Sequence, residues 1–180
     1  MTNAPEISVL EAIHTTRAIR RFKPDPIPEP LIQRILQAAR RAPSSSHSQP
    51  WHLIVIKDPG MLKALGEITT QGTFIGSAPL AIAVVMEADA PRPQLDAGRA
   101  IQQMELTAWG EGVGTCFVGI RIEEQQVKVK KLLGIPSEME LITILPFGYR
   151  DETVTREGPP SRTLSSLAHG ERFGQAYSAN

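Results

Sequence analysis

Three arginines near the N-terminus are the residues whose type and spacing best suit the binding of an anion. Arg17, Arg20 and Arg21 lie in the stretch TTRAIRRF, residues 15–22. A guanidinium group presents a planar fork of donors that matches phosphate oxygens in bidentate geometry. The stretch therefore predicts a short turn that offers positive charge to a phosphate-bearing ligand. For Arg20 or Arg21 taken singly, a solvated charge on a turn is an equally good interpretation.

A second candidate is the loop APSSSHSQPW, residues 42–51, which lies between a helical segment and an apolar run. Pro43 stops the preceding helix, and the serines that follow offer hydroxyl and backbone N–H groups. Pro50 favours an extended conformation of Gln49 before the apolar run begins. The pattern predicts a loop that binds an anionic or heteroaromatic ligand. A polar connection without a ligand is the alternative.

In this order, the two stretches resemble the FMN-binding elements of the nitroreductase family. The family pattern is an Arg-Ser-x-Arg-x-Phe turn, a proline-punctuated segment, a helix, and a Pro-Ser-x-x-Asn-x-Gln-Pro-Trp loop that enters a strand. These elements correspond to residues 17–22, 23–30, 31–42 and 43–51. Residues 112–119, GVGTCFVG, resemble the element whose backbone passes beside the flavin ring. Residues 162–167, RTLSSL, resemble the closing segment of the family.

The resemblance implies that FMN is the cofactor and that its contacts come from one set of residues. They are Arg17, Ala18, Arg20, Pro43, Ser44, Ser45, Ser46, Gln49, Val118, Gly119 and Arg162. Arg17 and Arg162 would hold the phosphate, and Arg20 would lie by the pyrimidine edge. FMN would carry the chemistry, so neither a catalytic side chain nor a metal site is expected.

Three positions depart from the family pattern. Ala18 replaces a serine, His47 replaces the asparagine of the loop, and Pro160 replaces a lysine of the closing segment. Ala18 lacks the hydroxyl group of the serine, and Pro160 lacks the positive charge of the lysine. Imidazole can still donate or accept a hydrogen bond, so whether His47 contacts FMN stays open.

Charge and cysteine content exclude several other classes of protein. The 19 basic and 19 acidic residues of the chain cancel, yet residues 14–42 carry a local excess of basic over acidic side chains. Such a local excess fits a small anion better than nucleic acid, which usually needs a basic face across the whole domain. The single cysteine, Cys116, excludes an internal disulfide and favours a buried apolar role. No signal or membrane-spanning segment is recognisable, so a cytoplasmic protein is expected.

Hydrophobic periodicity divides the chain into alternating helices and strands. Helices are predicted at residues 9–15, 31–42, 61–68, 95–110 and 123–133, and strands at 51–57, 80–86 and 139–147. In the first helix, Leu10 and Ile13 are expected to point inward. Phe74, in the connection 70–79, is a core residue or an aromatic lying over the ligand. The glycines of residues 110–114 precede a strand, which argues against a Rossmann dinucleotide site.

Periodicity alone does not distinguish a parallel from an antiparallel sheet, whereas the resemblance does. It implies an α+β nitroreductase-like fold, with a mainly antiparallel mixed sheet flanked by helices. We expect residues 1–180 to form a single domain and a homodimer with FMN at the interface. Residues 151–180 would form an extended C-terminal arm, the alternative being a floppy tail.

The function implied by the resemblance is hydride transfer from NADH or NADPH, through FMN, to a small acceptor. Nitroaromatics, quinones and activated alkenes are acceptors of this kind. The alternatives are a flavin-dependent dehalogenase or dehydrogenase of the same family and a flavin-binding sensor without turnover. The sequence does not distinguish the two nicotinamide donors.

Overall fold

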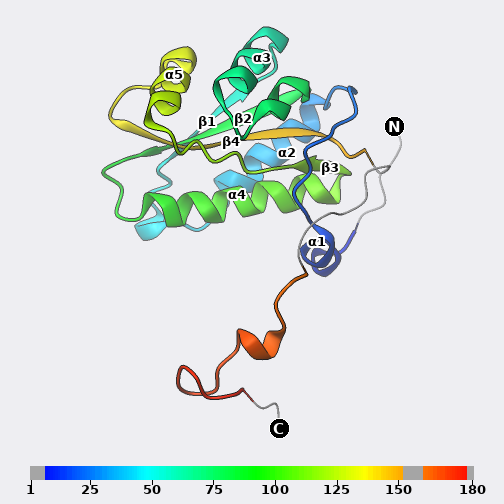
Figure 1. The fold of residues 1–180 in the computed structure, drawn as a ribbon, viewed down its shortest axis with the longest axis vertical. Helices are drawn as coiled ribbons and strands as arrows, with labels where there is room; N and C mark the ends of the chain where they lie inside the picture. The colour runs from blue at the N-terminus through cyan, green and yellow to red at the C-terminus, as the bar shows by residue number, and fades with distance from the viewer. Residues whose placement is uncertain (1–6, 152–159, 178–180) are drawn as a thin grey trace.

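The computed structural model describes residues 7–151 and 160–177 of the chain (Figure 1). Its body has three layers, a central antiparallel sheet with helices on both faces. The sheet order is β1 (Trp51–Ile56), β2 (Leu80–Glu87), β4 (Met139–Tyr149) and β3 (Val113–Thr115). All three strand pairings are antiparallel, as the resemblance implied.

The central strand β2 shows why both faces of the sheet need cover. Its residues from Leu80 to Met86 are buried without interruption, and only Glu87 at its end is exposed. Leu80, Ile82 and their even-numbered neighbours enter one core, whereas Ala81, Ala83 and Val85 enter the other. Because successive side chains of a strand point to opposite faces, the apolar run LAIAVVM requires two helical layers.

Two helical layers supply that cover (Figure 1). Helices α2 (Glu29–Arg40) and α4 (Pro93–Gly110) pack on one face of the sheet. Helices α3 (Pro59–Ile68) and α5 (Glu123–Leu133), with the 3₁₀ turn Thr73–Ser77, pack on the other. The predicted helices and strands are therefore present, with boundaries shifted by a few residues, and the three-residue strand β3 joins them.

Helix α1 (Val9–Thr15) forms as predicted, but the predicted orientation of its apolar side chains is wrong. The Ser8 hydroxyl accepts a hydrogen bond from the Glu11 backbone N–H at 3.1 Å, which caps the first turn. Leu10 and Ile13, expected to point inward, are 68% and 51% exposed. Ala12 is the residue of this helix that is buried. The apolar face of α1 has no partner within the described part of the chain.

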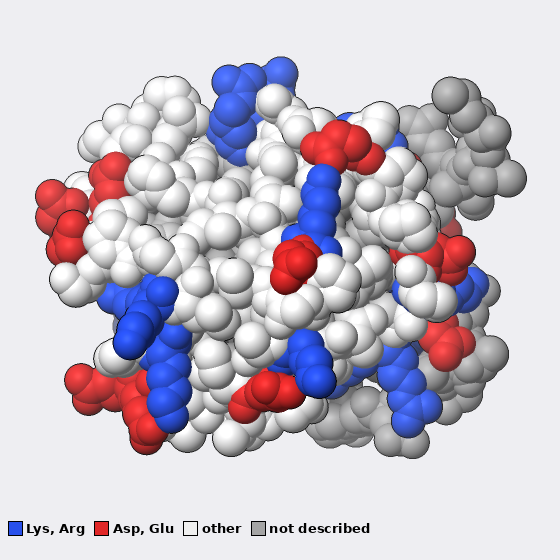
Figure 2. Space-filling view, turned by 90° about the horizontal axis from the view of Figure 1, so that it is seen from above, with Lys and Arg blue, Asp and Glu red and all other residues white. Residues whose placement is uncertain are grey.

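Charges of both signs alternate on the face covered by α3 and α5, with no extended field of one sign (Figure 2). Several of these charges pair locally, such as Lys128 with Glu124 across one turn of α5. No helix in the described ranges is long and apolar enough to cross a bilayer.

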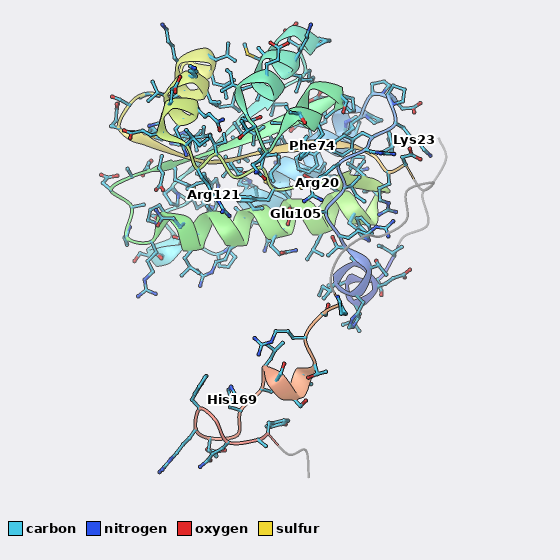
Figure 3. All side chains as sticks on the ribbon, in the orientation of Figure 1. Arg20, Lys23, Phe74, Glu105, Arg121 and His169 are labelled. Carbon is cyan, nitrogen blue, oxygen red and sulfur yellow. The ribbon has the colours of Figure 1, made fainter. Side chains whose placement is uncertain are left out.

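Residues 160–177 leave the body as an extended segment (Figure 1). It contains one 3₁₀ turn, Leu164–Ser166, and a β-bridge between His169 and Ala176. Figure 3 shows His169 on this segment, far from the residues labelled on the body. Apart from Ala168 and Gly170, every residue of 160–177 is exposed, and Phe173 is 94% exposed. The remaining parts of the predicted arm, 152–159 and 178–180, lie outside the described residues.

Candidate functional site

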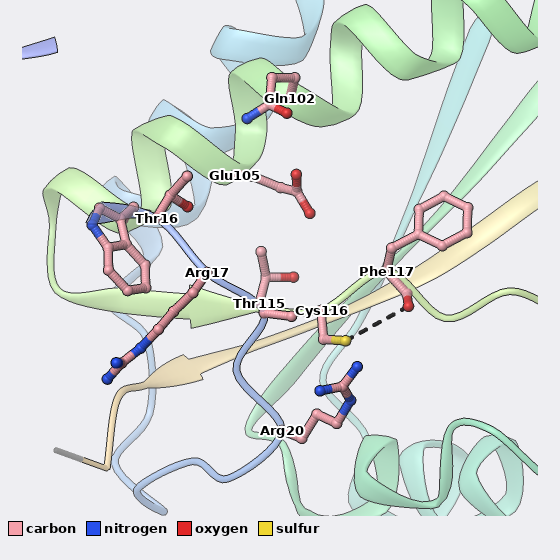
Figure 4. A pocket seen from close by; sticks show the side chains of 10 residues that line it. Thr16, Arg17, Arg20, Gln102, Glu105, Thr115, Cys116 and Phe117 are labelled. Atoms are coloured by element: carbon pink, nitrogen blue, oxygen red, sulfur yellow. Dashed lines mark hydrogen bonds between the residues drawn. The ribbon is translucent and has the colours of Figure 1, made fainter. Parts of the chain in front are cut away.

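A cavity of about 370 Å³ lies at the β3 edge of the sheet, between the N-terminal turn and α4 (Figure 4). It is lined by Thr16, Arg17, Ala18, Arg20, Gln102, Glu105, Trp109, Thr115, Cys116 and Phe117. Three of the predicted cofactor-binding residues, Arg17, Ala18 and Arg20, are among them. A second hollow of about 450 Å³ between α3 and α5 contains none of the predicted residues. The cavity beside β3 is therefore the candidate site.

Backbone contacts hold the arginine turn against the end of the sheet. The Ile19 N–H donates to the Thr115 carbonyl at 2.8 Å, and Ala18 forms a parallel bridge with Thr115. Further on, Phe22 forms an antiparallel bridge with Arg150 at the end of β4. The turn thus extends the sheet by a short edge segment, which fixes the backbone from which Arg17 and Arg20 project.

Arg17 and Arg20 give the cavity a positive lining. Neither forms an ion pair in the described part of the chain, and both are exposed. The guanidinium carbon of Arg20 lies 6.0 Å from the centroid of the Phe74 ring, but Phe74 does not line the cavity, so its core role is supported and its place over a ligand stays a prediction. Its ring is partly buried against the core beneath α3 and also contacts a cavity arginine.

Helix α4 contributes a wall of the cavity that the sequence interpretation missed. Gln102, Glu105 and Trp109 have the i, i+3, i+7 spacing that places side chains on one helical face. Trp109 Nε1 donates to Thr15 Oγ1 at 2.8 Å, and the Arg150 guanidinium stacks 4.0 Å from the Trp109 ring. The polar side chains at this helical spacing were the available signal for a cavity wall in the sequence, but a solvent-exposed helix face gives the same pattern.

Two buried groups beside β3 also escaped prediction as site residues. Cys116 is buried, as expected, and burial raises the pKa of its thiol, an effect that nearby Arg20 opposes. The Thr115 hydroxyl oxygen is fully buried and has no hydrogen-bond partner within the described residues. Buried polar atoms are almost always paired, so this hydroxyl is suited to a ligand or an ordered water.

Val118 and Gly119 follow directly on this wall. The Thr143 side chain of β4 clamps Val118, accepting from its N–H at 3.2 Å and donating to its carbonyl at 3.0 Å. A Cβ atom at Gly119 would lie 3.7 Å from both the Phe117 ring and Arg121 Nε. Gly119 thus leaves a gap between an aromatic ring and a guanidinium group.

The serine loop, residues 43–49, is held by a buried carboxylate. Asp96, with no exposed surface, accepts from the Ser45 N–H at 2.9 Å and from the Ser45 hydroxyl at 3.4 Å. Ser44 Oγ accepts from the Gln49 N–H at 2.9 Å. Both of these serines therefore shape the loop.

Backbone strain marks the same loop, and one expectation about it was wrong. Gln49, expected to be extended, has φ of 51°, and Ser46 and His47 have φ of 52° and 56°. Non-glycine residues seldom adopt the left-handed region, and such strain concentrates at functional sites. Gln49 is held there by its bond to Ser44 and by donation from its side chain to the Arg40 carbonyl at 2.9 Å. These two bonds outweigh the preference that Pro50 imposes.

The predicted residues do not meet in one cavity of a single chain. The serine loop is fixed at Asp96 in the first turn of α4, whereas the arginine cavity extends to Trp109 near the other end of the helix. At 1.5 Å rise per residue, Asp96 lies about 9 Å along the helix axis from Gln102, the nearest cavity residue of α4, and about 20 Å from Trp109. Arg162 lies on the extended C-terminal segment and donates to the Ser166 carbonyl at 2.7 Å. The structure thus groups the arginine turn with residues 115–117. Val118 and Gly119 follow directly in the chain but do not line the cavity, and the serine loop and Arg162 lie apart from it.

The chain is similar to proteins of known family. The sequence model described as the nitroreductase family matches residues 13–74 and 69–149. A Methanothermobacter thermautotrophicus protein named NADH dehydrogenase/NAD(P)H nitroreductase is 34% identical over 164 residues, covering 88% of this chain and 83% of that protein. The iodotyrosine deiodinase of Thermotoga neapolitana is 26% identical over 162 residues, covering 76% of this chain and 85% of that one.

A solved structure has the same architecture. The FMN-dependent nitroreductase from Clostridium difficile R20291 superimposes with a TM-score of 0.81 at 26% identity. The superposition covers 91% of this chain and 99% of that chain.

Proposed function

Because the chain belongs to the nitroreductase family, we propose that it transfers hydride from NADH or NADPH, through FMN, to a small acceptor. The chain is an oxidoreductase of this family and has its α+β fold. Nitroaromatics, quinones and activated alkenes are the proposed acceptors. The observation that carries the proposal is the cavity in which Arg17, Arg20 and the unpartnered Thr115 hydroxyl meet.

The residues at this cavity fit FMN. Arg17 supplies a guanidinium fork for the phosphate, and Arg20 supplies positive charge for the pyrimidine edge. The unpartnered Thr115 hydroxyl can bond to a polar atom of the cofactor. The Val118–Gly119 backbone, which Thr143 clamps, follows directly on the cavity wall and would lie beside the flavin ring. When bound, FMN accepts a hydride from the nicotinamide and passes it on, while the protein binds and orients both substrates.

A homodimer would complete the site. Arg162 and the serine loop of residues 43–49 are separated from the arginine cavity in one chain, and a second copy could bring them to it. The exposed apolar side chains of α1 and of the arm offer surface for that contact. They are Val9, Leu10, Ile13, Leu164, Leu167 and Phe173. Several large apolar side chains exposed on one segment are typical of an interface rather than of free surface.

Reductive dehalogenation is the second candidate, because a relative named iodotyrosine deiodinase aligns over 76% of this chain. The relative named NAD(P)H nitroreductase aligns over more of the chain and at higher identity, which favours the first proposal. A flavin-binding sensor is the third candidate, and it would bind the cofactor without turnover.

Substituting the two proposed phosphate ligands should weaken FMN binding. Loss of one hydrogen bond to a charged group costs about 1.5 to 3 kcal/mol, so Arg17→Ala and Arg162→Ala should each lower the affinity about 10- to 100-fold. Titration of the apoprotein with FMN, followed by flavin fluorescence, measures this change. Arg21→Ala is the matched control, since Arg21 lies on the same turn but does not line the cavity. Wild-type affinity in both test variants would refute the assignment.

A further inference from the structure

The Glu105 carboxyl group is a polar group in the cavity that the proposed function does not use. It is half-buried on α4 and projects toward the same space as the Thr115 hydroxyl (Figure 4). Glu105 forms neither a hydrogen bond nor an ion pair within residues 7–151 and 160–177. Thr115 Oγ1 likewise has no partner there. The Glu105 carboxyl group thus lies at the cavity without a partner among the described residues, and the unpartnered Thr115 hydroxyl is buried in the cavity wall at the end of β3.

The charges around Glu105 do not form a salt bridge with it. Arg17 and Arg20 line the cavity from the N-terminal turn, and Cys116 from the segment after β3. Arg150, at the end of β4, stacks on the Trp109 ring and donates to the Trp109 carbonyl. Arg20 lies close enough to Cys116 to oppose the rise in pKa that burial causes in that thiol, and its guanidinium also lies near Phe74. Helix α4 itself adds no second charged side chain to the cavity.

Burial therefore dominates the ionisation of Glu105. Removal from water disfavours the charged form of a carboxyl group, and burial raises the pKa of Glu105. An un-ionised carboxyl group has one O–H donor in addition to its acceptor oxygen, whereas a carboxylate only accepts. Bound ligand would exclude more water from this cavity and favour the un-ionised form further.

We propose that Glu105, in its un-ionised form, donates a hydrogen bond to a flavin acceptor atom and that Thr115 supplies a second hydrogen bond beside it. This inference rests on the proposed function, because it takes the cavity as the flavin site. A flavin offers ring carbonyl oxygens, ring nitrogens and ribityl hydroxyls, each of which accepts hydrogen bonds. Glu105 is in this sense a cofactor-binding residue that sets how strongly flavin is held at a given pH.

The direction of the pH effect follows from the donor role. Below the pKa of Glu105 the carboxyl group carries its proton and donates, so flavin binding is strongest there. As the pH rises through that pKa, the donor is lost and a negative charge appears in the cavity. Flavin affinity therefore falls with rising pH.

Riboflavin is the probe that isolates this effect, because it lacks the phosphate of FMN, whose second ionisation falls near pH 6. Apoprotein is titrated with riboflavin by fluorescence at a series of pH values rising from 4.5, the ordinary pKa of a glutamic acid, because burial raises the pKa of Glu105 above that value. Wild-type affinity should fall about five- to tenfold across this range, the loss expected for one hydrogen bond. Glu105→Gln should remove the pH dependence, since an amide donates at every pH in the range.

Glu123→Gln is the matched control, because Glu123 is an exposed residue at the start of α5 and does not line the cavity. It should keep the wild-type slope. Thermal unfolding followed by circular dichroism checks that both glutamine variants fold. Flavin binding that is independent of pH in the wild type, or equally pH-dependent in Glu105→Gln, would overturn the role of Glu105 and leave the proposed function intact. Wild-type protein that binds neither riboflavin nor FMN at any pH would overturn both.

Discussion

Replacing Gly114 with alanine is expected to lower FMN affinity at least tenfold while leaving the body of the protein folded. A Cβ atom at Gly114 would lie 2.5 Å from Ile19 Cγ1 and 2.7 Å from Ile19 Cβ. Ile19 is β-branched and stiff at χ1, and its backbone is bonded to Thr115, so it cannot simply rotate away. The arginine turn must move instead, and Arg17 and Arg20 would move with it.

Replacing Gly148, the cross-strand partner of Gly114, with alanine is expected to have a similar effect. Gly148 pairs with Gly114 between β4 and β3, and a Cβ atom there would lie 2.6 Å from Phe22 Cβ. The two glycines together leave room for Ile19 and Phe22, the two residues through which the arginine turn docks on the sheet. Overpacking of this kind costs about 1 to 3 kcal/mol, much of it borne by the docked turn.

Gly98→Ala is the control for these variants, because a Cβ atom at Gly98 meets nothing within 4 Å. It lies inside α4, where alanine is the better helix former, so stability should be unchanged or slightly raised. FMN titration and far-UV circular dichroism of the three variants give the comparison. Gly114→Ala protein that binds FMN as tightly as Gly98→Ala would show that the position of the arginine turn does not control binding.

Removal of the C-terminal arm is expected to weaken both dimerisation and FMN retention. Leu164 and Phe173 are 74% and 94% exposed in the single chain, and burying each fully would contribute about 1.5 to 3 kcal/mol. Arg162 lies on the same segment, and a phosphate ligand must be held still to bind well. An arm that packs on a second copy would also enlarge the interface beyond the usual 1,600 Å² or so. Sedimentation and flavin content of a chain truncated after Arg150 test both effects.

A milder variant distinguishes the contribution of the arm's apolar side chains from that of Arg162. Leu164→Ser with Leu167→Ser removes two apolar contacts and leaves Arg162 in place. Val127→Ser is the control, since Val127 on α5 is 59% exposed but belongs to neither α1 nor the arm. The double variant should shift the protein toward monomer, whereas the control should not. A truncated chain that stays dimeric and keeps its full flavin content would identify the segment as a dispensable tail.

Local signals in the sequence were strong enough to predict the helices and most of the sheet. The Ser8 cap, Gly134 with φ of 67° after α5, and the apolar run that forms β2 each specify structure through their immediate neighbours. The strand β3 was expected only as a strand without bounds after the glycines of residues 110–114, because three residues give no periodicity and its pairing partner is distant in sequence.

The wrong or missing predictions share a physical cause, which is that tertiary packing and side-chain hydrogen bonds override local residue preferences. Leu10 and Ile13 look like core positions by spacing, yet the chain provides no described partner for them. Gln49 looks extended because of Pro50, but its bonds to Ser44 and Arg40 override that preference. Glu105 looks like a surface residue of a helix until the fold places it opposite Thr115 (Figure 4).

The measurement that tests the central claim most directly is the absorbance spectrum of the purified protein before and after anaerobic addition of NADH or NADPH. We expect a yellow protein with a flavin spectrum, release of FMN on denaturation, and bleaching of the flavin band by at least one of the two donors. A yellow protein that neither donor bleaches would support the sensor instead of the oxidoreductase. A colourless protein that takes up no FMN when it is supplied would contradict the account.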